Sequence, residues 1–303
     1  KELSSFNDDI QGTGSVVLTG IIGATKIKKE KLSDQTYVIY GAGAGGVGVA
    51  DQIHAGLTRE GLDIQEARDK IYILDSRGLV FDDRPGLDEY KKQYAKPASI
   101  ATNWKLEKPG QASLTETINN VSVTVLLGTC GVGQSFKEEH VKQMLTYTER
   151  PMIFPLSNPT SNCEALPEDL YRWSDGKAIV ATGSPFDDVD YKGQKFRVGQ
   201  GNNVFIFPGV GLAAILAKAK EITIDMFTTA SFALAECVSD ADLELGTVYP
   251  RIKDLRKVSL HVAVKVIQEF IDKNPDHVLH EKNLAEYVED CMWKPVYLPY
   301  KKV

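Results

Sequence analysis

The stretch TYVIYGAGAGGVGVA, from Thr36 to Ala50, constrains the fold more than any other part of the chain. Its first part, Tyr37 to Tyr40, is a short run of β-branched and aromatic residues, which is typical of a buried parallel strand. Gly41, Gly43 and Gly46 follow with the spacing G-x-G-x-x-G. In a strand-to-helix turn, these glycines permit a tight bend, a close approach of backbone to a pyrophosphate, and close packing of the next helix, whose N-terminus favours anions. The stretch therefore predicts nucleotide binding, and a tight turn without a ligand is the alternative.

An acidic residue ends the next predicted strand. The apolar run Ile71 to Leu74 leads into Asp75, 29 residues after Gly46. An acid at this place in a dinucleotide-binding fold binds the adenosine ribose, but the usual separation is only ~20 residues, so the intervening helix is predicted to be extended. Asp75 would repel a 2′-phosphate, whereas Arg77 would attract one. The sequence thus favours NAD and leaves NADP open, and ordinary solvated charge is the alternative interpretation of Arg77 and Lys92.

Alternation of apolar strand-like runs with helical segments predicts an α/β fold, namely a Rossmann-like, doubly wound and mostly parallel sheet with a C-terminal helical extension. The extension rests on an apolar stripe with helical spacing from Leu255 to Phe270. Three parts are expected: an N-terminal segment (1–30) with an acidic pair and a helix, the dinucleotide-binding domain (31–248), and C-terminal helices that pack on it (249–303). The polar segment Gly78 to Ala112 is predicted to be a long surface excursion.

Composition excludes several classes of protein. The 303 residues are 43% hydrophobic and 25% charged, which is enough to bury a substantial core. A net charge of -6 leaves no basic surplus for a nucleic acid, and the longest apolar stretch, Val204 to Ala217, is too short and interrupted to span a membrane. The four cysteines lack zinc-ligand or disulfide spacing, so free thiols in a reducing compartment, the cytoplasm, are expected. The start at Lys1, without Met, suggests a piece of a longer polypeptide.

Two neighbouring acids, Asp8 and Asp9, precede the apolar segment Val16 to Ile27. One interpretation is structural, with either side chain capping a helix and interacting with its dipole. The other is chemical, with one carboxylate binding a divalent cation while its neighbour orients a reacting group. Neighbouring side chains point in different directions, so the two acids are expected to have different roles.

Polar residues follow the ends of the later strands. Gly128 opens a second glycine-rich turn, placed to pass along the nicotinamide half of a cofactor, and Asn158 follows the strand Met152 to Leu156. Asn202 and Asn203 lie in another glycine-rich bend. Because ligands gather outside the carboxyl ends of parallel strands, these amides are candidates for binding a polar ligand. The alternatives are an Asx turn at Asn158 and plain turn geometry at the asparagine pair.

These motifs together resemble the malic enzymes, which are malate dehydrogenases that also decarboxylate their substrate. The resemblance rests on FNDDIQGT at Phe6 to Thr13, GAGAGGVG at Gly41 to Gly48, DSRGL at Asp75 to Leu79, FPLSNPT at Phe154 to Thr160, TGSPF at Thr182 to Phe186, and GQGNNVFIFPGVGL at Gly199 to Leu212. They occur in family order, cover nearly the whole chain, and correspond to the family's carboxyl-terminal, nucleotide-binding portion. One departure is Gly46, where the family's fingerprint often has alanine, and this change leaves the expected class of cofactor unaltered.

The resemblance implies a role for each candidate residue. Asp9 would be a ligand of Mg²⁺ or Mn²⁺, and Asp8 would belong to the catalytic hydrogen-bond network. Asn158 and Asn203 would contact malate, with Asn202 beside them. The implied dinucleotide-binding residues are Gly41, Ala42, Gly43, Ala44, Gly45, Gly46, Asp75, Ser76, Arg77, Gly128 and Asn158.

The resemblance also implies an activity, the oxidative decarboxylation of malate to pyruvate and CO₂ with hydride transfer to NAD. The family's catalytic tyrosine and lysine and further acidic metal ligands belong to a preceding domain. The chain alone is therefore expected to be inactive and to need its own N-terminal domain as a partner, in a homo-oligomeric protein (dimer or tetramer). The closest rival is malolactic enzyme, which keeps NAD bound and delivers lactate, and the other is a dinucleotide-binding module without catalysis. An organellar matrix is the alternative to the cytoplasm.

Overall fold

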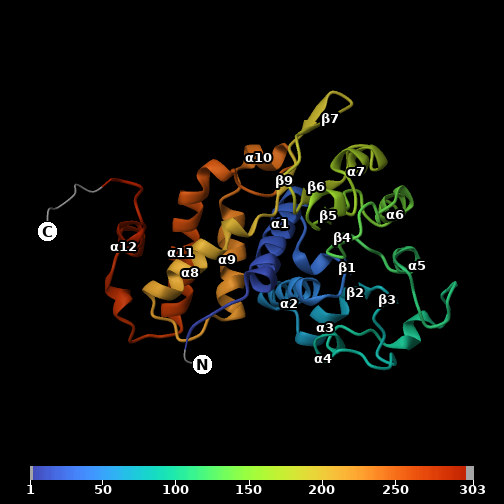
Figure 1. Cartoon of the computed structure of the whole chain (residues 1–303), viewed down its shortest axis with the longest axis horizontal. Helices are drawn as coiled ribbons and strands as arrows, with labels where there is room; N and C mark the ends of the chain where they lie inside the picture. Colours follow the sequence, from blue (N-terminus) through green and yellow to red (C-terminus); the bar gives the residue numbers. More distant parts are fainter. Residues whose placement is uncertain (1–2, 298–303) are drawn as a thin grey trace.

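A seven-stranded sheet forms the centre of the molecule, for which a computed structural model describes residues 3–297 (Figure 1). Its strands are β1 (Tyr37–Tyr40), β2 (Ile71–Asp75), β3 (Gly78–Leu79), β4 (Val125–Gly128), β5 (Met152–Pro155), β6 (Ile179–Thr182) and β9 (Gly199–Gln200). The strand order is β3-β2-β1-β4-β5-β6-β9, and every pairing is parallel except that of β2 with β3. A separate antiparallel hairpin consists of β7 (Val189–Tyr191) and β8 (Gln194–Phe196). The predicted Rossmann-like, mostly parallel sheet is confirmed.

Helices connect the strands and cover both faces of the sheet. The α-helices are α1 (Thr13–Lys28), α2 (Ala44–Arg59), α3 (Ile64–Asp69), α4 (Glu89–Lys92), α5 (Leu114–Asn120), α6 (Glu138–Met144), α7 (Pro167–Trp173), α8 (Phe207–Leu216), α9 (Ile224–Glu236), α10 (Asp240–Glu244), α11 (Leu255–Asp272) and α12 (Leu284–Cys291). A π-helical turn, η1 (Asp8–Gly12), precedes α1. Short 3₁₀ turns are η2 (Leu32–Asp34), η3 (Ala98–Ala101), η4 (Thr160–Asn162), η5 (Asn203–Phe205), η6 (Ile252–Asp254) and η7 (Val278–Glu281).

Side chains of the central strands alternate between two hydrophobic cores, one on each face of the sheet. Tyr37 and Ile39 of β1 belong to the core that contains residues of α1, α2, α8, α9 and α11. Val38, between them, belongs to the core formed with α5, α6 and α7. All three side chains are fully buried. Burial on both faces explains why this strand is a continuous apolar run rather than an alternating one.

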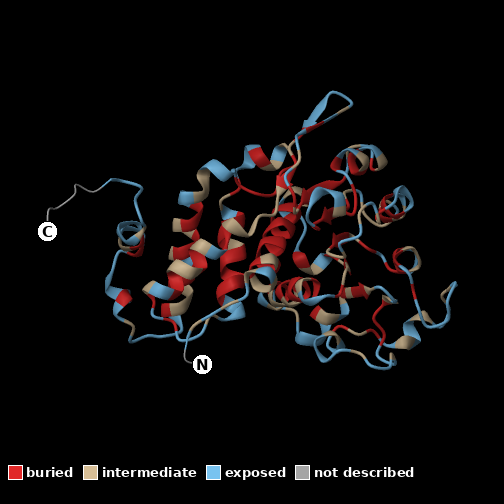
Figure 2. Cartoon of the chain, in the orientation of Figure 1, coloured by how far each residue is buried: buried red, intermediate tan, exposed pale blue. Residues whose placement is uncertain are grey.

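Helix α1 lies in the interior of the molecule, and most of its ribbon has the colour of buried residues in Figure 2. Its residues from Gly14 to Thr25 are all buried, because α2 and α9 pack against it and Phe154 of the sheet lies beside Gly20. The polar side chains of α1 are paired inside the core. Ser15 Oγ lies 2.8 Å from Ser231 Oγ of α9, and the Tyr249 hydroxyl donates a hydrogen bond to the carbonyl oxygen of Val16 (2.9 Å). The apolar segment after the acidic pair is thus a buried helix.

Glycines let α1 and α2 cross in direct backbone contact. A Cβ on Gly14 of α1 would lie 2.6 Å from the carbonyl oxygen of Gly48 in α2. A Cβ on Gly48 would in turn lie 2.8 Å from the carbonyl oxygen of Ile10 in η1. Side chains do not tolerate such separations, so this crossing requires glycine on both helices. The crossing holds η1 against the first turns of α2, beside the glycine-rich turn.

The segment Gly78 to Ala112 lies mostly on the surface, as its polar composition predicts, but parts of it are buried. Its buried residues include Val80, Phe81 and Tyr94. Lys96 anchors the segment, because its Nζ donates to the carbonyl oxygens of Arg68 and Asp69 at the end of α3, both at 2.8 Å. The last carbonyl groups of a helix have no intrahelical donor, so a lysine can bind there. The sequence did not predict these buried parts, because composition does not show which few residues of a polar segment find such partners.

The helices that follow the sheet form a layer on the α1 side of the molecule. Helices α8 and α9 precede the predicted boundary at residue 249 and α11 follows it, yet α11 packs against both. The buried residues of α11 have the spacing that the sequence predicts, and they are Val258, Ser259, Val262, Ala263, Val266, Ile267 and Ile271. The division into 1–30, 31–248 and 249–303 stays a prediction, and residues 1–2 and 298–303 lie outside the described part.

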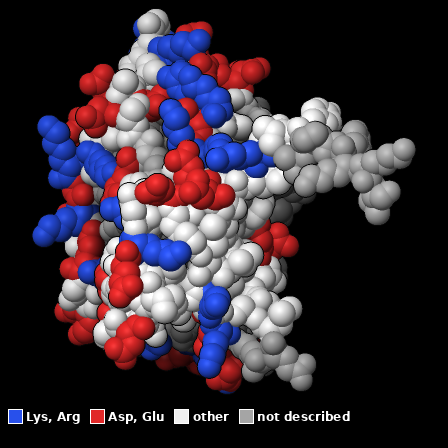
Figure 3. Space-filling view, turned by 90° about the vertical axis from the view of Figure 1, so that its left-hand side faces the viewer, with Lys and Arg blue, Asp and Glu red and all other residues white. Residues whose placement is uncertain are grey.

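Charges are mixed on the face of the molecule that Figure 3 shows, where basic and acidic side chains lie next to one another. This face shows no large area of one sign, in keeping with the net charge of -6. A surface of this kind gives a nucleic acid little electrostatic attraction. Within residues 3–297, no helix is both long enough and apolar enough to cross a lipid bilayer.

The glycine crossing yields a prediction about stability. In Gly48→Ala, the new methyl group would contact the Ile10 backbone, so we expect the free energy of unfolding to fall by about 1–3 kcal/mol despite alanine's better helix propensity. Gly211→Ala in α8 is the matched control, because a Cβ there meets nothing within 4 Å. The control should be neutral or more stable by up to about 1 kcal/mol. Urea unfolding of both variants measures the difference, and equal effects would contradict the proposed close crossing.

Candidate functional site

The glycine-rich turn after β1 leaves backbone amides open at the start of α2. Gly41 has φ of +128°, and its amide and that of Ala42 both donate to the carbonyl oxygen of Leu74 (2.8 Å each). A Cβ on Gly46 would collide with the Gly41 carbonyl oxygen, whereas a Cβ on Gly43 would meet nothing within 4 Å. The first residues of the helix, Ala44 to Gly46, have amides without intrahelical acceptors. Open space in front of such amides fits a pyrophosphate.

A cavity of about 480 Å³ lies against this turn. Its lining residues are Tyr40, Gly41, Ala42, Gly43, Asp75, Ser76, Tyr90, Lys91, Thr129, Cys130 and Val132. They come from the carboxyl ends of β1, β2 and β4 and from α4, which is the place where ligands bind in sheets of this type. Cys130 is a lining residue and burial raises the pKa of its thiol, so it is not an activated nucleophile. The structure therefore brings Asp75 and Ser76 to the glycine-rich turn as the sequence predicts.

Asp75 is already bound by basic groups. Arg84 Nη1 lies 2.8 and 2.9 Å from its two carboxylate oxygens, and Lys91 Nζ lies 3.6 Å from Oδ2. Arg77 donates its backbone amide to Oδ1 (2.9 Å) rather than its guanidinium. Burial alone would raise the pKa of Asp75, but the Arg77 amide and the charges of Arg84 and Lys91 outweigh burial and lower it. The carboxylate is thus held ionised, with lone pairs left for further donors.

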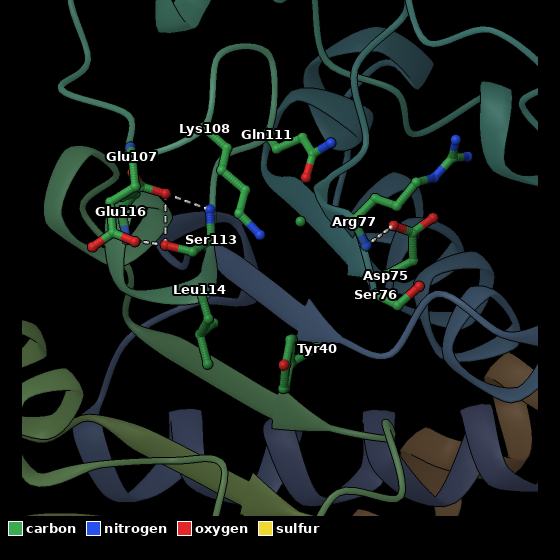
Figure 4. A pocket seen from close by; sticks show the side chains of 11 residues that line it. Tyr40, Asp75, Ser76, Arg77, Glu107, Lys108, Gln111, Ser113, Leu114 and Glu116 are labelled. Carbon is green, nitrogen blue, oxygen red and sulfur yellow. Dashed lines mark hydrogen bonds between the residues drawn. The ribbon is translucent and has the colours of Figure 1, made fainter.

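A smaller cavity, of about 200 Å³, borders the same strand ends (Figure 4). It shares Tyr40, Asp75 and Ser76 with the larger cavity. Lys108 and Gln111 line it from the loop before α5, and Figure 4 shows their side chains beside the opening. The two cavities therefore meet at the strand ends where the sequence places the adenosine half of a dinucleotide.

The acidic pair lies in η1, and neither acid caps a helix. The cap is Asn7, whose Oδ1 accepts a hydrogen bond from the amide of Asp9 (3.0 Å), so the predicted capping role was wrong, although both acids lie in the first turn of η1, where a helix dipole favours them. Asp8 Oδ1 is buried and has no hydrogen-bond partner among the described residues. Burial raises the pKa of Asp8 and the carboxylate of Asp9 adds to the increase, while a hydrogen bond from Asn203 opposes it. The two acids have different surroundings, as expected for neighbours.

A third cavity, of about 340 Å³, brings together four other predicted residues, whereas Asp8 and Gly128 do not line it. Asp9, Asn158, Asn202 and Asn203 all line it, although they come from three distant parts of the chain. The remaining lining residues are Thr13, Val16, Val17, Leu156, Gly183, Gln200 and Gly201. A Cβ on Gly45 would lie 3.6 Å from the backbone oxygen of Asp9, so this cavity begins beside the glycine-rich turn. One region of the surface therefore holds an acid, three amides and the turn.

Hydrogen bonds orient the three asparagines differently. Ser184 Oγ donates to Asn158 Oδ1 (2.6 Å), so the amide group of Asn158 is the part that can donate to a ligand. Asn202 Oδ1 accepts from the Val204 amide (3.0 Å) at the start of η5. Asn203 Nδ2 lies 3.0 Å from the backbone oxygen of Asp8 and 3.2 Å from its Oδ2. Asn203 thus connects the acidic pair to the loop after β9.

Two residues that hold the site were missed in the sequence. Arg84 lies in the segment predicted to be irregular surface, and only the fold shows that it reaches Asp75 nine residues earlier. Ser184 lies in the motif TGSPF, so a signal existed, but nothing in a single sequence links it to Asn158. Gly128 packs on the carboxyl group of Glu164, beneath the turn that it opens.

Comparison with known proteins identifies the family. A family model described as "Malic enzyme, NAD binding domain" matches residues 10–271. The chain belongs to this family. It is 39% identical over 297 residues to the NAD-dependent malic enzyme of Aliivibrio fischeri (strain ATCC 700601 / ES114), a match that covers 98% of this chain and 53% of that protein. It is also 39% identical over 299 residues to the chloroplastic NADP-dependent malic enzyme of Zea mays, covering 98% of this chain and 45% of that protein.

The chain thus spans about half the length of the malic enzymes that it matches. The crystal structure of Entamoeba histolytica malic enzyme is similar with a TM-score of 0.71 and 24% sequence identity, over 96% of this chain and 54% of that one. This likeness supports the fold. Since relatives with either cofactor in their names match equally well, family membership leaves the choice between NAD and NADP to the residues around Asp75.

The donor set at the acidic pair partly fits the divalent cation that the resemblance implies. Asp9 opens into the cavity and Asp8 Oδ1 is a buried oxygen without a partner, and oxygens of this kind are the ligands that Mg²⁺ and Mn²⁺ take. Within residues 3–297, however, no group of three or more His, Cys, Asp or Glu side chains converges to hold a metal ion. This chain would therefore supply only some of the ligands.

The ion pair at Asp75 yields a prediction about stability and pH. In Arg84→Ala the partly buried Asp75 carboxylate loses its main partner, so we expect the free energy of unfolding to fall by about 1–3 kcal/mol at pH 7. The folded-state pKa of Asp75 is lowered, so the stabilisation that the ion pair gives the wild type is fully present above the unfolded pKa of about 3.9. It disappears as the pH falls through the folded-state pKa, and the difference between wild type and variant should disappear with it. Urea unfolding at several pH values measures this.

Arg77→Ala is the control for this prediction, because the Arg77 side chain is exposed and only its backbone contacts Asp75. Its effect should stay within about 0.5 kcal/mol at every pH. A difference between wild type and Arg84→Ala that persists unchanged at low pH would show that the ion pair is not its origin.

Proposed function

We propose that this chain is the dinucleotide-binding half of a malic enzyme, which oxidises malate with NAD and decarboxylates it to pyruvate and CO₂. The observation that carries the proposal is the meeting of Asp9, Asn158 and Asn203 in one cavity next to the glycine-rich turn. A binding module without catalysis has no need for an acidic pair and uncharged amides beside its cofactor site. The chemistry of the cavity therefore favours an enzyme over such a module.

The dinucleotide would run from the cavity at Asp75 to the cavity at Asn158. The amides of Ala44 to Gly46 would bind its pyrophosphate, and the Asp75 carboxylate would accept the ribose hydroxyl groups. Ser76, Arg77 and Gly128 are proposed to flank it. NAD is the proposed cofactor because Asp75 repels a 2′-phosphate, although its pairing with Arg84 weakens that repulsion. NADP is thus the weaker of two possible ligands.

Malate would lie in the cavity that the three asparagines line. The amide group of Asn158 donates to a carboxylate without adding charge, and Ser184 fixes its orientation. Asp9 would hold Mg²⁺ or Mn²⁺, which when bound polarises the substrate carbonyl and stabilises the charge that develops as CO₂ leaves. Asp8, with Asn203 bound to it, would keep the acidic pair in place and accept a hydrogen bond in the catalytic network.

The remaining catalytic groups are proposed to come from the protein's own N-terminal domain, in a homo-oligomer. The family relatives are about twice as long as this chain, and the cavity at Asp9 lacks both a general acid–base pair and a full set of metal ligands among the described residues. We propose a cytoplasmic location, on the free cysteines alone.

The proposal predicts that the chain binds NAD without the preceding domain but turns over malate only when that domain is attached. Calorimetry with NAD and NADP gives the dissociation constants, and we expect the constant for NAD to be the smaller. The protein extended to include that domain should release NADH and pyruvate from malate in the presence of Mn²⁺. Lactate without free NADH would instead indicate malolactic activity, and no turnover in the extended protein would contradict the enzymatic proposal.

Two substitutions separate the proposed metal and cofactor roles. Asp9→Asn in the extended protein should lower metal-dependent turnover by at least about 100-fold, since one lost carboxylate affects the cation and not the pyrophosphate turn. Its affinity for NAD should stay within about twofold of wild type. Asp75→Ala should instead lower the affinity for NAD and leave the affinity for the metal ion unchanged. If both variants lose NAD equally, the role given to Asp9 is wrong.

A further inference from the structure

Glu164 is a fully buried acid whose function the site described above does not include. Its Oε1 accepts hydrogen bonds from the Cys130 amide (3.0 Å) and the Ser157 hydroxyl (2.5 Å), and its Oε2 accepts from the Ser157 amide (3.3 Å). The thiol of Cys130 also points to Oε1, at 3.5 Å. Every contact comes from a donor, which is the pattern of an ionised carboxylate that acts only as an acceptor.

No basic side chain within residues 3–297 forms an ion pair with Glu164, and its hydrogen bonds come from the neutral residues Cys130 and Ser157. This distinguishes it from Asp75, which Arg84 neutralises. A charge inside a protein is costly unless it is paired, and hydrogen bonds from amides only partly offset that cost. The negative potential of an unpaired buried charge also extends further than that of an ion pair. Glu164 therefore makes its surroundings attractive to a cation.

The position of Glu164 links the two cavities of the proposed dinucleotide site. Cys130 lines the cavity at the glycine-rich turn, and Asn158, next to Ser157, lines the cavity at Asp9. The Ser157 hydroxyl also accepts a hydrogen bond from the Gly131 amide (2.9 Å), so Glu164 and Ser157 together fasten the loop after β4 to the loop after β5. A dinucleotide that extends from one cavity to the other must pass these loops with its nicotinamide end.

We propose that Glu164 is a positioning residue that makes this site favour the oxidised dinucleotide over the reduced one. The nicotinamide ring of NAD⁺ carries a positive charge and that of NADH is neutral, so the unpaired carboxylate beneath the two loops attracts the first more strongly. The inference rests on the proposed function, because it requires a nicotinamide dinucleotide in these cavities. It concerns binding equilibria and can be tested on this chain without catalytic turnover.

Glu164→Gln tests the proposal, since it removes the charge and keeps the size of the side chain. We expect the dissociation constant for NAD⁺ to rise roughly three- to tenfold more than that for NADH, both measured by calorimetry on the folded chain. Ser157→Ala keeps the charge and loosens the loops, so it should weaken both forms by equal factors. Glu60→Gln is the matched control, because Glu60 also accepts two backbone amides, from Leu32 and Ser33, but lines none of the three cavities, and it should change neither constant.

Equal changes for NAD⁺ and NADH in Glu164→Gln would overturn the proposal and leave Glu164 a purely structural residue. If that variant does not fold, the wild-type chain decides: it must bind NAD⁺ more tightly than NADH, and the reverse order overturns the inference. Failure of the wild-type chain to bind either dinucleotide would instead overturn the proposed function, and the inference with it.

Discussion

The crossing of α1 and α2 is the contact on which the rest of the site depends. Gly14 and Gly48 let the two helices approach with backbone against backbone, and Ile10 contacts Gly48 at the same place. Because α2 begins at the glycine-rich turn and α1 begins after the acidic pair, this crossing sets the distance between the two features. The metal-binding and dinucleotide-binding functions proposed for the chain therefore rest on two residues that contact neither ligand.

The site uses three acids in three different electrostatic surroundings. Asp75 is paired with Arg84 and its pKa is lowered, so it is a fixed charge suited to hydroxyl groups. Burial raises the pKa of Asp8, and its Oδ1 has no hydrogen-bond partner in the described structure. This oxygen is therefore free to accept a hydrogen bond from a bound ligand or to bind a cation. Glu164 is buried among neutral donors. The same functional group can thus take the three roles proposed for it, in recognition, chemistry and positioning, because the neighbours differ.

The three cavities described above contain only part of the groups that the proposed reaction needs. The chain covers about half of the two malic enzymes compared above, and these three cavities follow the carboxyl ends of the strands. We propose that the preceding domain completes this surface, which gathers an acidic pair and three amides without a complete metal site among the described residues.

The sequence by itself determined the elements whose signals are local. Neighbouring residues determine the strand Tyr37 to Tyr40 and the turn at Gly41. Both were predicted with nearly the right bounds. The tertiary structure alone decided which distant groups meet. Three features depend on contacts between residues that the fold brings together. They are the pairing of Arg84 with Asp75, the hydrogen bonds that Glu164 receives from two loops, and the partial burial of the segment after Gly78. Such partners leave no periodic or compositional signal in a single chain, because burial and pairing are properties of the packed molecule.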